Sequence, residues 1–197
     1  MNTFSIATWN VNSLRVRLPQ LAEWLTAVQP DIVALQETKL PDADFPAAEI
    51  QALGYQVTYS GQRTYNGVAV LSRAPLTPIA TDIPGFVDEQ RRVLAVETQG
   101  CIVVDLYVPN GQEPGSDKYA YKLRWLEALR GWLVELHKLG RPLIVLGDFN
   151  IAPEDRDVHD PIAWQGSVHV SEPERHAFAR LLETGLVDVF RRFEQAP

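Results

Sequence analysis

Polar side chains follow four short apolar segments of the sequence, at the points where each segment ends. The four endings are Trp9-Asn10-Val11-Asn12, Gln36-Glu37-Thr38-Lys39, Tyr107-Val108-Pro109-Asn110 and Gly147-Asp148-Phe149-Asn150. A carboxylate beside amide side chains offers oxygen ligands and no sulfur, a set that suits Mg²⁺ or Mn²⁺ better than zinc. Such a metal ion, with Asn and Tyr donors around it, is what the hydrolysis of a phosphodiester needs.

Each of these residues also has an ordinary structural explanation. Glu37 can cap the turn that follows its segment, and Asp148 with Asn150 after a glycine is typical of a turn closed by its own side chain. Tyr107 can belong to the core with its hydroxyl at the rim, and Asn10 can simply end a strand. We favour a functional site because four polar endings occur together while the segments themselves stay apolar.

Length and composition predict one ordinary globular domain over residues 1–197. The apolar share is 46% and the charged share is 22%, which excludes disordered, collagen-like and coiled-coil chains. The formal net charge is −7, from 18 basic and 25 acidic residues, which argues against a uniformly basic surface that coats nucleic acid or an acidic membrane. A local basic groove is compatible with these counts.

The sequence predicts a cytoplasmic protein that does not enter a membrane. Residues 1–6 lack the basic and apolar regions of a signal peptide, and no stretch approaches the roughly 20 apolar residues that a membrane helix needs. The single cysteine, Cys101, cannot form an intrachain disulfide, and its apolar neighbours predict that it is buried.

Apolar spacing predicts strands and helices that interleave along the chain. Strands are expected at 4–11, 32–35, 55–59, 68–71, 93–98, 102–108, 143–146 and 186–190, and helices at 18–28, 45–53, 118–139 and 172–184. Pro19 is expected in the first turn of its helix. Ser116 or Asp117 caps the long helix, which Gly140 ends, and a capping box beginning at Ser171 starts the last helix.

This order of elements favours a layered α/β (α+β) fold, with sheet packed on sheet and helices outside, over a doubly wound sheet. No Gly-x-Gly-x-x-Gly follows the first strand, and the sequence contains no Gly-x-x-x-x-Gly-Lys-Ser/Thr. Dinucleotide sites and P-loop nucleotide sites are therefore not expected.

Several ordered motifs carry a resemblance to a known family. They are TWNVNSLR at 8–15, LQETK at 35–39, QRRV at 90–93, YVPNG at 107–111, GDFNIAP at 147–153 and GLVDVFR at 185–191. The set resembles the exonuclease III family of DNA repair nucleases, over essentially the whole chain. The resemblance implies the four-layer α/β sandwich of the endonuclease/exonuclease/phosphatase superfamily, with two mixed sheets packed face to face and helices outside.

The resemblance also implies roles for the matching residues. Asp148 would activate water or assist the leaving group, and Asn150 would orient the phosphate. The catalytic residues are then Tyr107, Asp148 and Asn150, the metal ligands are Glu37, Asn10 and Asn12, and the residues that contact DNA are Asn110, Arg92, Arg91 and Lys39. Mg²⁺ is the implied cofactor, with Mn²⁺ as a substitute, and the implied partner is double-stranded DNA with an abasic site or a 3′ end.

The sequence departs from the family pattern near its end. Members carry a Trp-x-Asp-Tyr-Arg stretch, an Arg-Ile-Asp motif and a terminal Ser-Asp-His motif, and none of these is present here. None of the four histidines has a Ser-Asp-His context, so none is assigned as a general base. We therefore expect that C-terminal strands are missing and that the 197-residue chain alone has little activity.

The leading interpretation is a Mg²⁺-dependent DNA phosphodiesterase of base-excision repair, which incises at abasic sites, trims 3′ ends, or both, and which is a monomer if complete. Two alternatives stay open. One keeps the fold and acts on a small-molecule phosphodiester, and the other is a non-catalytic module that binds DNA or protein. A DNA enzyme is expected to gather basic residues on the face of the site, which would make its affinity depend on salt.

Overall fold

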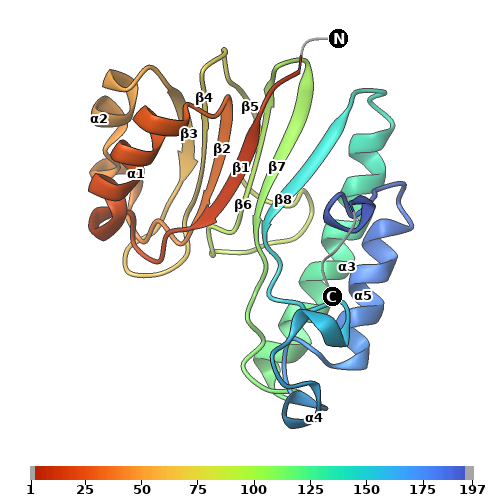
Figure 1. Ribbon diagram of the computed structural model, residues 1–197. Coiled ribbons are helices and arrows are strands. Elements are labelled where there is room, and N and C mark those ends of the chain that lie inside the picture. Colours follow the sequence, from red (N-terminus) through yellow and green to blue (C-terminus); the bar gives the residue numbers. More distant parts are fainter. Residues whose placement is uncertain (1–2, 194–197) are drawn as a thin grey trace. The chain divides into compact units, whose positions relative to one another are not determined.

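The computed structural model describes residues 3–193, which form two compact units (Figure 1). Within this described part, the first unit comprises residues 3–108 and 140–149, and the second comprises residues 109–139 and 150–193. A single domain over 1–197 stays a prediction. The structure contains no helix among the described residues that is long and apolar enough to cross a membrane.

Two four-stranded sheets make up the first unit. The strand order in one sheet is β1 (Ile6–Asn10), β2 (Ile32–Gln36), β4 (Val68–Ser72), β3 (Gln56–Ser60), and in the other β5 (Thr77–Ala80), β6 (Val93–Thr98), β7 (Cys101–Tyr107), β8 (Leu143–Asp148). The pairs β1–β2 and β7–β8 are parallel, and all other neighbours are antiparallel. The prediction of two mixed sheets is confirmed.

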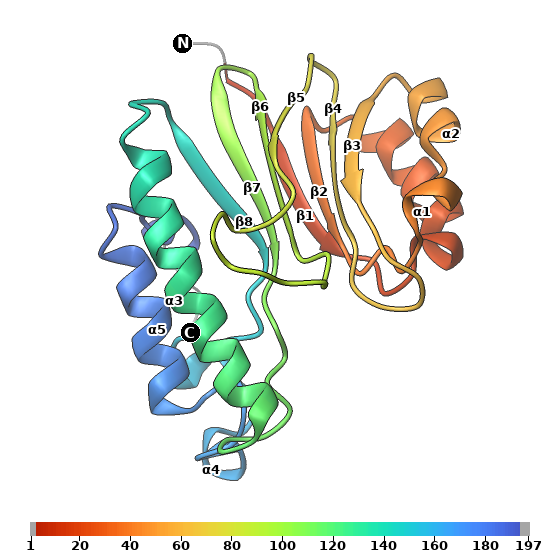
Figure 2. The ribbon, with the colours of Figure 1, turned by 180° about the vertical axis from the view of Figure 1, so that it is seen from behind.

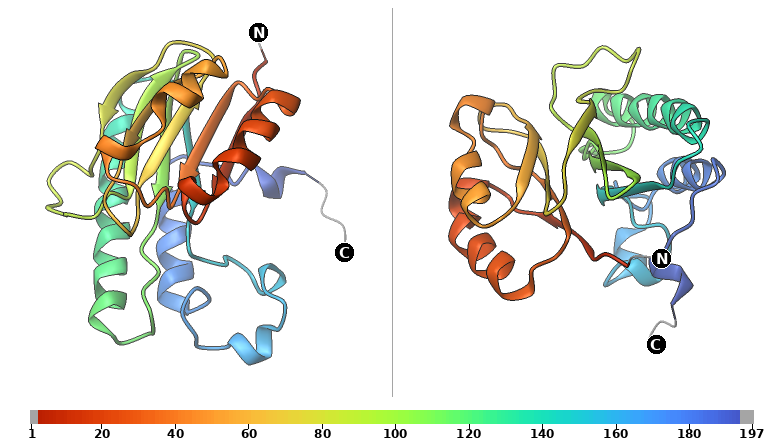
Figure 3. Two further views of the ribbon diagram at one scale, coloured as in Figure 1. Left: turned by 90° about the vertical axis from the view of Figure 1, so that its left-hand side faces the viewer. Right: turned by 90° about the horizontal axis from the view of Figure 1, so that it is seen from above.

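The two sheets face one another, and helices α1 (Leu14–Val28) and α2 (Ala47–Ala52) lie on the outer side of the first (Figure 3). Strand β2 is buried along its whole length because both of its faces are covered. Val33 and Leu35 pack toward the helices, whereas Ile32 packs with Val96 and Val103 of the opposite sheet. A continuous apolar run without alternation is what a strand covered on both faces requires.

The second unit contains α3 (Asp117–His137) and α5 (Glu172–Leu182), which lie side by side (Figure 2). The predicted caps are confirmed: the Ser116 side chain accepts a hydrogen bond from the backbone N–H of Tyr119, and Ser171 with Glu174 forms a capping box. In the sequence, the 3₁₀ turn Asp155–Asp157 and the short helix α4 (Pro161–Trp164) come between β8 and α5. The first unit has a further 3₁₀ turn at Asp42–Asp44.

Several expected elements differ from the structure at their ends. Helix α1 begins at Leu14, so Pro19 lies in its second turn and not in its first. Strand β8 continues through Asp148 and is half-buried, where a buried strand was expected, because β8 is an edge strand of the described sheet. Strand β5 was not predicted because Pro78 interrupts its sequence pattern. Pro78 is accommodated at an edge, next to an irregularity in the pairing with β6.

The strand predicted at 186–190 is wrong. Residues 186–189 have no regular structure, and a 3₁₀ turn follows at Phe190–Arg192. The Asp188 side chain accepts a hydrogen bond from the backbone N–H of Arg191, which favours a turn over an extended strand. Val187 and Val189 are exposed, so the apolar alternation that predicted a strand is not matched by burial.

A buried polar cluster joins the two sheets next to the strand ends. Gln36 on β2 donates from Nε2 to Asp105 Oδ1 on β7 at 2.7 Å and to Thr8 Oγ1 at 3.0 Å. Among the described residues, Asp105 Oδ2 has no hydrogen-bond partner, and the Asp105 side chain is fully buried. Burial raises the pKa of the Asp105 carboxyl well above its ordinary value, and the hydrogen bond from Gln36 offsets only part of that effect.

A raised pKa in the folded state means that folding takes up a proton at pH values between the unfolded and the folded pKa of Asp105. This contribution favours the folded state at pH values below the unfolded pKa, and it is lost as the pH rises toward the folded pKa. We predict that Asp105→Asn removes this loss. Relative to the variant, the wild type should lose up to about 1.4 kcal/mol of unfolding free energy per pH unit above about pH 4. Urea unfolding between pH 4.5 and 8 measures how the free energy of unfolding changes with pH in the wild type and in the variant. The same pH dependence in both proteins would contradict the prediction.

Candidate active site

The Asn10 side chain links two carboxylates that come from different sheets. Its Nδ2 donates to Glu37 Oε1 at 2.7 Å and to Asp148 Oδ2 at 2.8 Å. Asn10 ends β1, Glu37 follows β2, and Asp148 ends β8. The register pairs Asn10 with Gln36 and Tyr107 with Asp148, so the carboxyl ends of all four parallel strands meet at one edge of the first unit.

Tyr107 completes this group from the end of β7. Its hydroxyl donates to Glu37, and burial followed by the nearby Glu37 carboxylate raises the pKa of Tyr107 to about 12. The Arg92 guanidinium lies over the Tyr107 ring, 4.6 Å from its centre, and donates to the Tyr107 carbonyl oxygen at 3.0 Å. Tyr107 is therefore a neutral hydroxyl donor at neutral pH, held by Glu37 on one side and Arg92 on the other.

Glu37 remains ionised in this setting. Burial opposes its charge, but hydrogen bonds from Asn10, Lys39 and Tyr107 outweigh burial and hold the pKa of Glu37 below its ordinary value. Lys39 Nζ lies 2.9 Å from Glu37 Oε2 and also donates to Asn12 Oδ1. Glu37 and Asn12, two of the three predicted metal ligands, therefore both contact the Lys39 ammonium.

The oxygen donors fit a divalent metal ion of the Mg²⁺ type. Glu37 and Asn12 supply a carboxylate and an amide oxygen around one positive group, whereas Asn10 Oδ1 accepts from the backbone N–H of Asn12. The described residues contain no group of three or more His, Cys, Asp or Glu side chains that could hold a metal. A single carboxylate is nonetheless typical of magnesium sites, since Mg²⁺ keeps water ligands and shares substrate phosphates.

The backbone around Glu37 is held in a conformation that is rare for residues other than glycine. Glu37 has φ +56° and Asn12 has φ +45°. Such positions cost of order 1–3 kcal/mol each and persist only where the surroundings fix them. Here Ser13 N–H donates to the Glu37 carbonyl at 2.8 Å, and Thr38 N–H donates to the carbonyl of Gly67 at 3.1 Å. Neighbouring loops therefore fix the direction of the Glu37 side chain.

A basic hollow adjoins this loop in the first unit. Its volume is about 430 Å³, and its lining includes Arg15, Lys39 and Arg63 together with the single carboxylate Asp44. Arg15 and Asp44 approach to 3.7 Å, and both side chains are largely exposed. The hollow therefore combines three cations with one acid next to the Glu37 loop, which suits the backbone of a polyanion.

Asn110 and Asn150 belong to the second unit. Asn110 lies in the loop after β7, and Asn150 lies in the loop after β8. Asn110 Nδ2 lies 3.0 Å from Nε2 of His169, and Asn110 Oδ1 accepts from the backbone N–H of Gln112. Asn150 has φ +49°. The contact between Asn110 and His169 was not predicted, since 59 residues separate the two and no motif surrounds the histidine.

Comparison with known proteins identifies the family. A sequence profile described as the endonuclease/exonuclease/phosphatase family matches residues 7–186. The chain belongs to this family. The exodeoxyribonuclease of Bacillus subtilis (strain 168) is 35% identical over 191 residues, which cover 94% of this chain and 74% of that protein. The predicted resemblance to exonuclease III is thereby confirmed.

Solved structures of family members share the fold. A variant of the 3′ phosphatase NExo from Neisseria, bound to product DNA hairpin, matches with a TM-score of 0.89 and 42% identity, over 96% of this chain and 74% of that one. An AP endonuclease from Archaeoglobus fulgidus matches with a TM-score of 0.93 and 37% identity, over the same shares of the two chains. These relatives are hydrolase enzymes, and the exonuclease III family generally depends on divalent metal ions.

The structure brings most of the predicted site residues of the first unit together, with one exception. Asn10, Glu37, Tyr107 and Asp148 form the linked group described above, with Asn12, Lys39 and Arg92 beside it. Arg91 instead directs its guanidinium to Asp82, with which it forms an ion pair at 3.1 Å. Arg91 and Arg92 point in different directions because neighbouring side chains of an extended segment face opposite sides.

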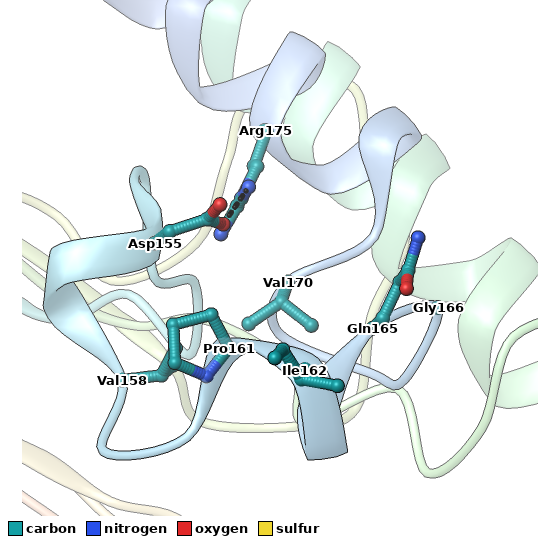
Figure 4. A pocket seen from close by; sticks show the side chains of 8 residues that line it. All are labelled: Asp155, Val158, Pro161, Ile162, Gln165, Gly166, Val170 and Arg175. Carbon is teal, nitrogen blue, oxygen red and sulfur yellow. Dashed lines mark ion pairs between the residues drawn. The ribbon is translucent and has the colours of Figure 1, made fainter.

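A second hollow, of about 330 Å³, lies in the second unit between α4 and α5 (Figure 4). Arg175 reaches from α5 toward Asp155, and the two form an ion pair at 2.8 Å across its wall. Ile162, which lines the hollow, is exposed, and so is the neighbouring Trp164. Trp125, on α3 of the same unit, is buried.

The position of Asp148 depends on a glycine that precedes it. Gly147 has φ +133°, and a Cβ there would lie 2.0 Å from the carbonyl oxygen of Leu106 on β7. We predict that Gly147→Ala lowers the free energy of unfolding by on the order of 3 kcal/mol, since the added methyl group forces β8 away from β7.

Gly131→Ala is the matched control for this prediction. Gly131 lies inside α3 with no atom near its would-be Cβ, so alanine should stabilise the protein by about 0.5–1 kcal/mol. Urea unfolding of both variants measures the difference. A Gly147→Ala variant as stable as the wild type would show that β7 and β8 do not require the close approach.

Proposed function

We propose that the protein hydrolyses phosphate esters of DNA with the help of Mg²⁺, trims 3′ ends and incises at abasic sites in base-excision repair. The observation that carries the proposal is the Asn10 amide between Glu37 and Asp148, with the Tyr107 hydroxyl on Glu37. Two carboxylates, an amide and a neutral hydroxyl at one point supply a metal ligand, a proton acceptor and hydrogen-bond donors. Phosphoryl transfer needs each of these.

Each residue then has a defined task. Glu37, with Asn12 beside it, would hold Mg²⁺, which when bound offsets the negative charge on the phosphoryl oxygens. Asp148 accepts a hydrogen bond from Asn10, which aims its carboxylate as the acceptor of a proton from water or as the group that assists the leaving oxygen. When the substrate is bound, Tyr107 turns its single hydroxyl proton from Glu37 to a phosphoryl oxygen. Asn110 and Asn150 are proposed to orient the phosphate.

The relatives favour 3′ ends as the first substrate to test. The Neisseria 3′ phosphatase is 42% identical to this chain and the archaeal AP endonuclease 37% identical. A cytoplasmic location and a monomeric state belong to the same proposal. The buried, unpaired Cys101 is compatible with a reducing compartment.

We predict that Mg²⁺-dependent cleavage is lost in Glu37→Gln. The substitution keeps the size of the side chain and removes the charge that holds the metal, so turnover should fall by roughly a hundredfold or more. The assay uses two duplex oligonucleotides, one with a 3′-phosphate and one with an abasic-site analogue. Both proteins are assayed with enzyme in excess over DNA, so that slow turnover can be measured.

Asp82→Asn provides a control for the charge change, because Asp82 pairs with Arg91 away from the Glu37 group. It should retain wild-type turnover. Cleavage that survives removal of metal by EDTA would contradict the proposal. DNA binding without turnover of either duplex would favour the non-catalytic alternative.

We predict that DNA affinity depends on salt through the basic hollow. Replacing one phosphate-contacting cation should reduce the slope of log affinity against log salt concentration by about 1. Arg63→Gln tests this, and Arg130→Gln is the matched control because Arg130 lies on α3 in an ion pair with Glu127. Fluorescence anisotropy of a labelled duplex over a roughly fourfold range of salt concentration gives both slopes. A wild-type affinity that does not change with salt would argue for a small-molecule substrate.

A further inference from the structure

Lys122 is a buried lysine of the second unit that contacts the backbone of two proposed phosphate-orienting residues. Its Nζ donates to the carbonyl oxygen of Asn150 at 2.6 Å and to that of Asn110 at 3.1 Å. The side chain has no exposed surface. A lysine ammonium has three N–H donors and no acceptor, so it can gather several oxygens at one point. Here it joins the chain that follows β7 to the chain that follows β8.

Glu174 supplies the negative charge that this buried ammonium requires. Its Oε1 lies 2.5 Å from Lys122 Nζ, and its side chain is also fully buried. Glu174 Oε2 accepts from the Ser171 hydroxyl at 2.5 Å, and Ser171 Oγ lies 2.5 Å from the Tyr119 hydroxyl. Buried ion pairs are stable only when further hydrogen bonds satisfy their remaining atoms. The ion pair with Glu174 holds the ammonium where the two carbonyls meet it.

The loop after β7 packs closely over the stem of the lysine. Gly111 has φ +93°, and a Cβ there would lie 3.0 Å from Lys122 Cδ and 3.3 Å from Val168 Cγ2. The neighbouring Asn110 is held at its carbonyl by Lys122 and at its side chain by His169 and Gln112. Both the position and the direction of the Asn110 amide are therefore determined within the second unit.

The contacts of Lys122 exceed what joining two helices requires. An ion pair with Glu174 alone would tie α3 to α5, as the exposed pair of Arg180 with Glu127 already does. The two carbonyls belong to Asn110 and Asn150, which lie outside both helices. Because a fully buried ammonium donates to the carbonyls of two loops, we infer that its role includes fixing the positions of these loops.

We propose that Lys122, paired with Glu174, is a positioning residue that holds Asn110 and Asn150 for the reaction. The proposal rests on the proposed function and extends it to residues without substrate contact. Lys122 acts through the two asparagines, and loss of its donors leaves both carbonyls without their shared partner. Displacement of groups that orient a phosphate lowers turnover more than it lowers substrate binding.

The test compares a double variant, Lys122→Met with Glu174→Gln, against Tyr119→Phe. The double variant removes both buried charges while it keeps the sizes of the side chains, so no unpaired charge is left to unfold the protein. Tyr119→Phe removes a hydroxyl from the same network and leaves Lys122 and its carbonyls in place. Thermal melting establishes that all proteins are folded at the assay temperature.

Kinetics on the 3′-phosphate duplex give the first readout. The double variant should lose about 10–100-fold in kcat with a change in KM of about threefold or less, whereas Tyr119→Phe should stay within about twofold of the wild type. A folded double variant with wild-type kcat would overturn the proposal. Equal losses in both variants would also overturn it, because the network would then act only through general stability.

The carbonyl ¹³C resonances of Asn110 and Asn150 give a second readout that needs no activity. Both should shift in the double variant and stay in place in Tyr119→Phe. Unchanged resonances in the double variant would overturn the proposal whatever the kinetics show. If the wild type cleaves no DNA, the proposed function fails, and the resonances alone decide whether Lys122 holds the two loops.

Discussion

The hydrogen bonds of the Asn10 amide are the interaction on which the rest of the site depends. One NH₂ group donates to Glu37 and to Asp148, so two carboxylates from different sheets are held close together. Carboxylates at this spacing repel one another unless donors or cations lie between them. The amide, the Lys39 ammonium and the Tyr107 hydroxyl provide that compensation. The proposed metal ligand Glu37 and the proposed proton acceptor Asp148 are therefore held by the same amide.

The fold supplies the precision that this arrangement needs. Parallel pairing of β1 with β2, and of β7 with β8, brings four strand ends to the same edge of the first unit. Backbone hydrogen bonds from neighbouring loops then hold Glu37 at a positive φ, which an unsupported chain would avoid. Gly147 lets β8 approach β7 closely enough to align Asp148 with Tyr107. The site is thus built on strand ends and on loops that backbone hydrogen bonds hold in place.

Sequence reasoning predicted the strand ends but not the contacts between them. A continuous apolar run located β2 closely, because a strand covered on both faces has that pattern. An alternation with period two located β4 and β6. The link from Asn10 to Asp148 spans 138 residues, and no local pattern encodes it. At 186–190, in contrast, a local pattern predicted a strand that the structure does not contain. The alternation there resembles a strand, yet a side-chain hydrogen bond to the backbone selects a turn.

The sequence around Lys122 contains a signal for a buried ion pair. Lys122 falls within the buried stripe of α3, between Tyr119 and Leu126, where an ordinary amphipathic helix has apolar residues. A charged residue in such a stripe indicates a buried partner, and the capping-box residue Glu174 is that partner. The carbonyl contacts were beyond prediction, because they depend on how two loops from distant parts of the sequence meet the helix.

The central claim is that Glu37 and Asp148 act as one catalytic unit through Asn10. A double-mutant cycle tests it most directly, with Glu37→Gln, Asp148→Asn and the two combined, measured by kcat on a 3′-phosphate duplex in the presence of Mg²⁺. The account predicts strong non-additivity, with the double variant about as slow as the slower single variant. If the loss in kcat of the double variant equals the product of the two single losses, the two carboxylates act independently, and this result would contradict the account.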